Sequence, residues 1–177
     1  ESPLDKDGYL HSGDYAEIDS DGFVKLTGRK SEVFKTSTGR KIAPAGIEGV
    51  IQKVTNINQV LIIGKDQKYL IALITCTNYN EIFSDENNEL IKNLKLELSN
   101  CLVGLPRYKC PAGIVIAENE FSIVNRELTS NLKLKRKNIL NNYSDAIARI
   151  YQELDDDESG IHQKSMRISS QLILFKL

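Results

Sequence analysis

The side chains best suited to chemistry in the first thirty residues are Asp14 and Arg29. Asp14 ends the turn-forming stretch Ser12-Gly13-Asp14, and a carboxylate has two acceptor oxygens that can bind the two vicinal hydroxyls of a sugar together. The alternative is an aspartate that stabilises its own turn. Arg29 carries a rigid fork of donors that fits hydroxyl and phosphate oxygens. The alternative for Arg29 is a surface ion pair, with Glu32 or another neighbour, of little energetic value.

A basic run provides a third group of candidate residues. Lys133 is followed by Lys135, Arg136 and Lys137. The ammonium group of a lysine is a compact charge on a long stem, which suits negative charge that develops on phosphate oxygens. Two other interpretations of the run are a solvated helix start and a nucleic-acid patch.

Composition excludes several classes of protein. The 177 residues have 23 Lys+Arg against 24 Asp+Glu, a net charge of −1 that gives no global attraction to nucleic acid or anionic lipid. No apolar run approaches the roughly 20 residues of a membrane span. Three cysteines without C-x-x-C spacing predict free thiols in a reducing compartment, and two histidines are too few to predict a metal site.

The elements that position the candidate residues follow from turn signals and periodicity. Asp-Gly between alternating stretches predicts that Ala16–Ile18 and Phe23–Leu26 pair as a hairpin, which cannot bury a face alone and must pack on something else. A second small hairpin is expected over residues 32–42, with Thr38-Gly39 near its turn. Pro44 then opens a helix, whose early Glu48 is interpreted as structural because the helix dipole favours an acid there.

Later segments predict alternating strands and helices. Two β-rich runs, 59–63 and 69–75, precede a helix that Ser84 caps, with Asp85 and Glu86 in its first turn. A short buried strand follows at 114–116. A last helix is expected after a polar loop, with one apolar face made of Ile139, Tyr143, Ala146, Ile147 and Ile150. The apolar stripe of the second helix is Ile91, Leu94, Leu98, Cys101 and Leu102.

This order predicts an α+β domain from about residue 31 to 151, with a hairpin plus a short mixed sheet and three helices. Residues 152–177 read as an acidic linker and tail. For the apolar segment 171–177 three explanations stay open: an added strand, a contact with a partner, or an artefact of the end of the chain.

Three stretches together, 8–14, 28–48 and 127–137, resemble in order and spacing the C-terminal part of the adenylate-forming enzymes. That superfamily includes acyl-CoA synthetases, peptide-synthetase adenylation domains and luciferases. The pattern Leu-Thr-x-x-x-Lys-Leu-Lys-Arg-Lys at 128–137 is similar to the long-chain fatty acyl-CoA synthetases. In that group Leu precedes the key lysine, as Leu132 precedes Lys133, whereas most other branches have Gly. The resemblance implies that residues 1–30 end a large N-terminal nucleotide-binding domain and that 31–151 form its small C-terminal lid.

The resemblance also implies roles for individual residues. Asp14 and Arg29 match nucleotide-binding residues at the ribose of ATP. Lys133 matches the catalytic lysine, which stabilises charge on the α-phosphate and the pyrophosphate leaving group. Ser31 matches the hinge about which the lid rotates, although Asp or Lys is usual there.

Two further residues match a loop that faces the pantetheine arm of CoA. These are Thr38 and Gly39, and long-chain members usually have Gly-Gly at this place, so the first glycine is not matched. Lys135, Arg136 and Lys137 remain surface or CoA-phosphate candidates. No metal ligand is predicted.

The function implied is that of the C-terminal portion of a long-chain fatty acid–CoA ligase, in which an acyl-adenylate forms first and a CoA thioester second. ATP, Mg²⁺ and CoA would serve the full-length enzyme, and none is expected bound to the isolated chain, which is expected to be inactive. The full-length enzyme would bind fatty acid, ATP and CoA, and no binding of nucleic acid is expected. Its expected location is the cytoplasm. A peripheral membrane contact is left open, and oligomeric state is not predicted. The alternatives are a fatty acid–acyl-carrier-protein ligase and a stand-alone lid that binds a partner without catalysis.

Overall fold

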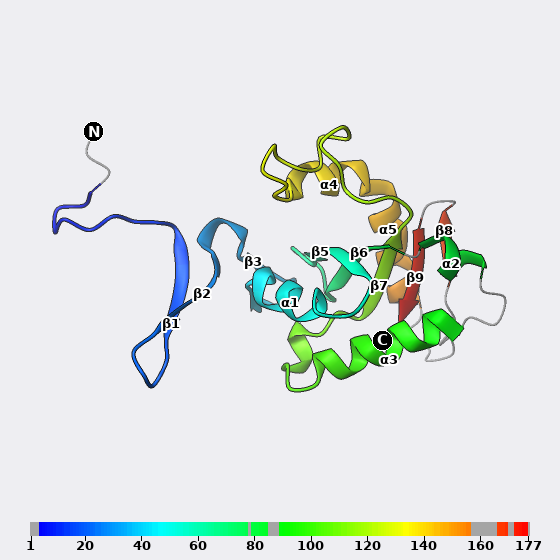
Figure 1. Ribbon diagram of the computed structural model, residues 1–177, viewed down its shortest axis with the longest axis horizontal. Coiled ribbons are helices and arrows are strands. Elements are labelled where there is room, and N and C mark those ends of the chain that lie inside the picture. The colour runs from blue at the N-terminus through cyan, green and yellow to red at the C-terminus, as the bar shows by residue number, and fades with distance from the viewer. Residues whose placement is uncertain (1–3, 78, 85–88, 157–165, 170–171, 177) are drawn as a thin grey trace.

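The computed structural model describes residues 4–77, 79–84, 89–156, 166–169 and 172–176, and consists of an N-terminal hairpin beside a layered body (Figure 1). In the hairpin, β1 (Asp14–Ile18) pairs antiparallel with β2 (Val24–Arg29). Ala16 lies opposite Leu26, which confirms the predicted pairing. Large apolar side chains of this hairpin are exposed, Ile18 by 74% and Phe23 by 71%, so they bury little of their surface within the described chain.

A short irregular stretch joins the hairpin to the body. It comprises a 3-10 helix, η1 (Lys30–Glu32), and a two-stranded ribbon of β3 (Phe34–Lys35) and β4 (Lys41–Ile42). The ribbon confirms the second predicted hairpin. Helix α1 (Pro44–Ile51) begins at Pro44 as predicted, because proline needs no amide partner in a first turn.

A sheet of five strands forms the centre of the body, in the order β5 (Ile57–Ile63), β6 (Ile71–Cys76), β7 (Gly113–Ala117), β9 (Leu172–Lys176), β8 (Met166–Ser169). Of the neighbouring strand pairs described in this sheet, β6 and β7 run parallel and the others antiparallel. A parallel pair needs a crossover connection. Helices α2 (Tyr79–Ser84) and α3 (Glu89–Leu102) provide it.

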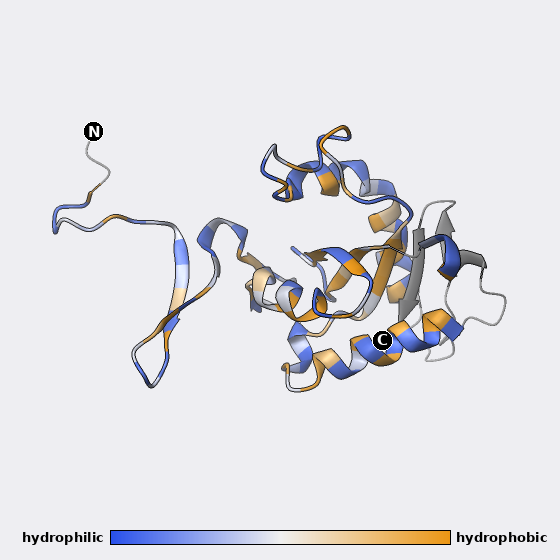
Figure 2. Cartoon of the chain, in the orientation of Figure 1, coloured by the Kyte–Doolittle hydropathy of each residue, from blue (hydrophilic) through white to orange (hydrophobic). Residues whose placement is uncertain are grey.

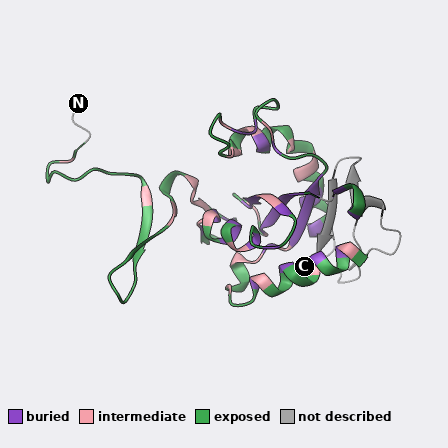
Figure 3. Ribbon diagram, in the orientation of Figure 1, coloured by how far each residue is buried: buried purple, intermediate pink, exposed green. Residues whose placement is uncertain are grey.

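Both faces of the sheet are covered. Val60 and Ile62 of β5 pack toward α1 and α3, whereas Leu61 and Ile63 pack toward the other layer. That layer contains α4 (Arg136–Asn142) and α5 (Ser144–Asp156). Burial on both faces explains why the central strands are continuous apolar runs rather than alternating ones (Figures 2 and 3).

The described helices differ from the three that were predicted. Five α-helices are present in the described residues. Ser84 is the last residue of α2 and not the cap of the next helix, so that prediction was wrong; Asp85 and Glu86 lie outside the described residues. The second helix, α3, does bury its predicted stripe, with Cys101 only partly covered.

The last predicted helix is two helices that meet at Tyr143. Its backbone leaves the helical region with φ −106 and ψ 14. Two asparagines of poor helix propensity precede it, and its ring packs edge-on against Phe121 with ring centroids 6.1 Å apart. Side-chain packing at this point therefore accompanies the break in the helix.

The predicted acidic linker and tail over residues 152–177 differs from the structure in two described segments. Helix α5 continues to Asp156 and buries Leu154. Strand β9 then pairs antiparallel with β7, and β8 pairs with β9. The backbone of β9 supplies hydrogen-bond partners for the edge of β7 that would otherwise be open. Of the three explanations for the apolar segment, the structure therefore matches an added strand. The domain boundary at residues 30–31 stays a prediction.

None of the described helices has the length and apolar character needed to cross a bilayer.

Candidate functional site

Asp14 and Arg29 face each other at the open end of the N-terminal hairpin. They are paired residues of β1 and β2, and Arg29 Nε lies 3.0 Å from Asp14 Oδ1. Next to this pair, the amide of Lys30 donates a hydrogen bond to Gly13 O at 2.8 Å, which joins the two chain segments beyond the paired strands. The Arg29 side chain is 55% exposed, so the pair contributes little to stability. The structure thus joins the two predicted nucleotide-binding residues, and the ion-pair partner of Arg29 is Asp14 rather than Glu32.

Ser31, the predicted hinge, is the exposed middle residue of η1. This short helix connects the hairpin on one side with the body on the other (Figure 1). A pivot at this position would turn one part against the other. The hinge role itself stays a prediction.

Thr38 and Gly39 lie in the loop between β3 and β4. Gly39 has φ +79, which favours glycine, and its amide donates to Thr36 O at 2.9 Å. The Thr36 hydroxyl lies 2.9 Å from the Thr38 hydroxyl. The amide of Ser37 donates to Gln67 O at 3.0 Å, which ties the loop to the β5–β6 turn. The loop is therefore a well-bonded turn rather than a loose connection.

A cluster of cations beside this loop was missed by the sequence analysis. The Arg40 guanidinium lies 5.2 Å from the centroid of the Tyr108 ring, and Lys109 Nζ lies 5.9 Å from it. Neither cation has an ion pair in the described part of the chain. The signal that could have found the cluster is the run Arg-Tyr-Lys at 107–109, confined between two prolines.

Lys133 lies on a small hairpin that precedes α4. An isolated bridge joins Leu128 to Leu134, and Thr129 N donates to Lys133 O at 2.8 Å. Leu132 has φ +57, in the left-handed region, and Lys133 is exposed. The lysine is thus presented to solvent from a turn whose base is buried through Leu128. We call residues 127–135 the lysine hairpin.

The lysine hairpin and the Asp14–Arg29 pair are not brought together. The segment between β7 and α4 lies at the top of the body in Figure 1, whereas β1 and β2 lie apart at the left. The predicted site residues therefore occupy four separate places: the N-terminal hairpin, η1, the Thr38–Gly39 loop and the lysine hairpin.

Arg136 was left as a surface or CoA-phosphate candidate, and the structure places it in an internal ion network. Its Nη2 donates to Glu48 Oε2, and its Nε lies 3.6 Å from Glu32 Oε2. The other carboxylate oxygen of Glu48 accepts a hydrogen bond from Ile62 N at 2.8 Å. These contacts agree with a structural role for Glu48, but the reason given from the sequence was wrong, because Glu48 is the fifth residue of α1 and lies beyond its first turn.

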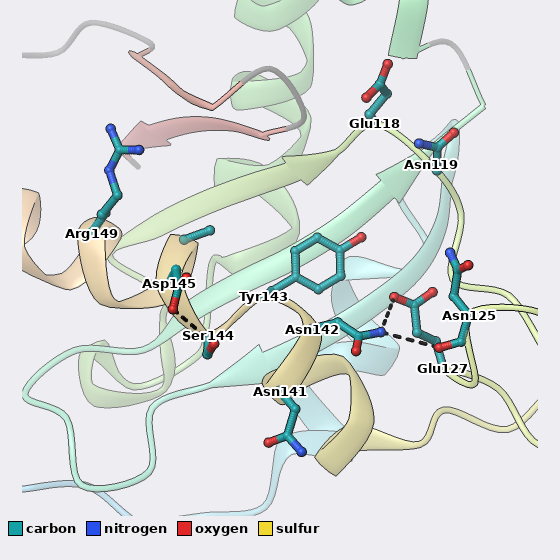
Figure 4. A pocket seen from close by; sticks show the side chains of 11 residues that line it. Glu118, Asn119, Asn125, Glu127, Asn141, Asn142, Tyr143, Ser144, Asp145 and Arg149 are labelled. Atoms are coloured by element: carbon teal, nitrogen blue, oxygen red, sulfur yellow. Dashed lines mark hydrogen bonds between the residues drawn. The ribbon is translucent and has the colours of Figure 1, made fainter.

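A polar cavity of about 540 Å³ lies between α4 and α5 on one side and, on the other, the segment after β7 together with Glu127 of the lysine hairpin (Figure 4). Glu127 is 3% exposed there, and its carboxylate accepts hydrogen bonds from Ser122 N and Asn142 Nδ2, both at 3.1 Å. Burial, with a smaller effect of the Glu127 charge, raises the pKa of Tyr143 to about 12. Tyr143 therefore stays protonated at neutral pH. The described residues contain no cluster of ligands that could hold a metal ion.

Comparison with known proteins adds sequence relatives. Residues 32–155 match the model of the AMP-binding enzyme C-terminal domain. Fatty acyl-CoA synthetase B of Dictyostelium discoideum is 32% identical over 166 residues, which is 85% of this chain and 25% of the relative. Long-chain-fatty-acid–CoA ligase ACSBG1 of Rattus norvegicus is 29% identical over 182 residues, with the same two shares. The chain spans about a quarter of the length of these relatives.

Solved structures show the same fold. The adenylation domain of a carboxylate reductase from Mycobacterium chelonae aligns with a TM-score of 0.72 at 22% identity, over 84% of this chain and 24% of that one. A Mycobacterium tuberculosis fatty acyl CoA synthetase aligns with a TM-score of 0.53 at 24% identity, over 81% and 26%. The family match covers the layered body from η1 to α5, and with these neighbours it shows that the chain belongs to the family of AMP-binding enzyme C-terminal domains, the small α+β lid of the adenylate-forming fold.

Proposed function

We propose that this chain is the C-terminal part of a long-chain fatty acid–CoA ligase. In the first half-reaction a fatty acid carboxylate attacks the α-phosphate of Mg-ATP and expels pyrophosphate, giving an acyl-adenylate. In the second, the CoA thiol displaces AMP and gives the thioester. The observation that carries the proposal is Lys133, exposed at the end of a bonded turn on a lid of this family.

The proposed roles follow from charge and geometry. Lys133 supplies a positive charge at the α-phosphate, where negative charge increases in the transition state. The Asp14 carboxylate accepts the ribose hydroxyls, and Arg29, held 3.0 Å from it, donates to the nucleotide. Rotation about Ser31 alternates the faces of the lid between the two half-reactions.

The Thr38–Gly39 loop and the neighbouring cations support CoA as the acceptor. Arg40 and Lys109 lie near the ring of Tyr108 and have no carboxylate partner in the described residues. Unpaired cations suit phosphate groups, and an accessible aromatic ring suits a stacked base. The same positive surface would also suit an acidic carrier protein, which keeps a fatty acid–acyl-carrier-protein ligase as the second candidate.

The test is Lys133→Ala in the full-length ligase, with the two half-reactions assayed separately. Fatty-acid-dependent exchange of pyrophosphate into ATP should fall on the order of 10²–10³-fold, the usual effect of losing one preorganised charge. Thioester formation from supplied acyl-adenylate should be unchanged. Arg126→Ala, an exposed cation near the same hairpin, is the matched control. Equal losses in both half-reactions would contradict the proposed role.

The isolated chain provides a second test. Because it spans a quarter of its relatives, we expect it neither to turn over substrate nor to bind ATP tightly. Micromolar ATP binding to residues 1–177 in calorimetry would contradict this expectation.

A further inference from the structure

Arg136 is placed to control where Lys133 lies. It is the first residue of α4 and follows Lys133 by three positions. Three residues of extended chain span roughly 10 Å at most, so the start of α4 and the lysine cannot move independently over long distances. The Arg136 side chain is 21% exposed, and its guanidinium reaches two carboxylates.

The main partner of Arg136 is itself fixed in the body. Glu48 belongs to α1, and its side chain is 11% exposed. One of its oxygens accepts a hydrogen bond from Ile62 N in the edge strand β5, and the other accepts from Arg136. Hydrogen bonds between ionised groups are the strong ones. Arg136 is therefore anchored to a point that helix α1 and the central sheet both define.

The second partner lies beside the hinge. Glu32 follows Ser31, and its carboxylate lies 3.6 Å from Arg136 Nε. A planar guanidinium can serve both carboxylates because its donors point in fixed directions. This ion pair thus links Glu32, the first residue after the predicted hinge, to Arg136, the first residue after the lysine hairpin.

We propose that Arg136 is a positioning residue for adenylation: through Glu48 it fixes the lysine hairpin on the lid, so that Lys133 reaches the α-phosphate when the lid closes. The inference rests on the proposed function of Lys133. Because the guanidinium is engaged by Glu48 and Glu32, Arg136 acts through Lys133 rather than on the substrate. A shift of about 1 Å in a reacting group can cost on the order of 10²-fold in rate.

The experiment uses Arg136→Met in the full-length ligase, which keeps an unbranched stem and removes the charged guanidinium. Pyrophosphate exchange should fall roughly 10- to 100-fold. Thioester formation from supplied acyl-adenylate, measured on the same preparation, should change by less than about twofold, since Lys133 has no role in that step. Arg126→Met is the matched control, because Arg126 is exposed and makes no ion pair among the described residues. It should leave both rates unchanged.

Two further variants separate positioning from folding. Arg136→Met leaves the buried Glu48 carboxylate without a cation, so Glu48→Gln/Arg136→Met removes that charge while the amide oxygen still accepts from Ile62 N. This double variant should be as stable as the wild type in thermal unfolding and should still be defective in adenylation. Arg136→Lys keeps a charge but not the fork, and should restore part of the lost rate.

A double-mutant cycle decides between the interpretations. If Arg136 acts through Lys133, Lys133→Ala/Arg136→Met should be no slower in adenylation than Lys133→Ala alone. Additive losses, or equal losses in both half-reactions, would overturn the inference while leaving the function of Lys133 intact. Unchanged adenylation in Lys133→Ala would overturn the proposed role of Lys133, and the positioning role of Arg136 with it.

Discussion

Two glycines of the lid offer a matched test of the backbone geometry. Gly39, in the β3–β4 loop, has φ +79, whereas Gly46 lies inside helix α1. A Cβ added at either position meets no atom within 4 Å. Steric contact is therefore equal at the two sites, and the backbone conformation alone should decide what an alanine does.

The expected effects have opposite signs. Gly39→Ala places an L side chain in the left-handed region at a cost of about 1–2 kcal/mol, partly offset by a less flexible unfolded chain. The net loss of unfolding free energy should be about 1 kcal/mol. Gly46→Ala should raise it by about 0.5–1 kcal/mol, because alanine is the better helix former. For a chain of this size each kcal/mol shifts Tm by about 2–4 °C.

The assay is urea and thermal unfolding of residues 1–177, followed by circular dichroism. Gly46→Ala should unfold later than the wild type and Gly39→Ala earlier. If Gly39→Ala were as stable as Gly46→Ala, the loop would not hold the left-handed turn described, and the account of the Thr38–Gly39 loop would fail.

Two further outcomes are expected. Burial raises the pKa of the Cys76 thiol from 9.0 to about 12, so the reactive thiolate is scarce at pH 8. Iodoacetamide should therefore alkylate Cys76 only in denaturant. Rapid labelling of Cys76 in the native protein, measured by mass spectrometry, would contradict its burial. The same shift means that Cys76 contributes stability that is complete below pH 9 and is lost as the pH rises toward 12. Glu127→Ala should lower the unfolding free energy by about 2–4 kcal/mol, since it leaves donors from Ser122 and Asn142 unpaired. Glu118→Ala, exposed on the same cavity, should change it by less than about 0.5 kcal/mol, and equal losses in the two variants would argue against the bonding described for Glu127.

Local patterns in the sequence predicted the centre of the fold well. The runs that became β5, β6 and β7 are apolar and β-branched, and Pro44 marks the start of α1. These signals depend on neighbouring residues only. Where a boundary depends on packing elsewhere, prediction failed: the helix break at Tyr143 accompanies contact with Phe121, and the place of β9 depends on the open edge of β7.

The candidate site divides in the same way. Lys133, Asp14 and Arg29 stand in recognisable stretches, and the structure shows the last two in contact. The partnership of Arg136 with Glu48 joins residues 88 positions apart, and no local pattern indicates it. The cation cluster at Tyr108 likewise forms only when the β3–β4 ribbon lies beside the 3-10 helix η2 (Arg107–Lys109).

The backbone at Leu132 shows why such distant contacts matter for the proposed chemistry. The resemblance puts glycine at this position in most branches, and here a leucine occupies the left-handed region with φ +57, at a cost of about 1–2 kcal/mol. The Leu132 side chain is 69% exposed and recovers little by burial. The turn must therefore be held by its base: Leu128 is buried, and Arg136 is bound to Glu48 just beyond. If so, the presentation of Lys133 is set by contacts outside the turn, and a substitution at Arg136 should disturb it more than Leu132→Gly does.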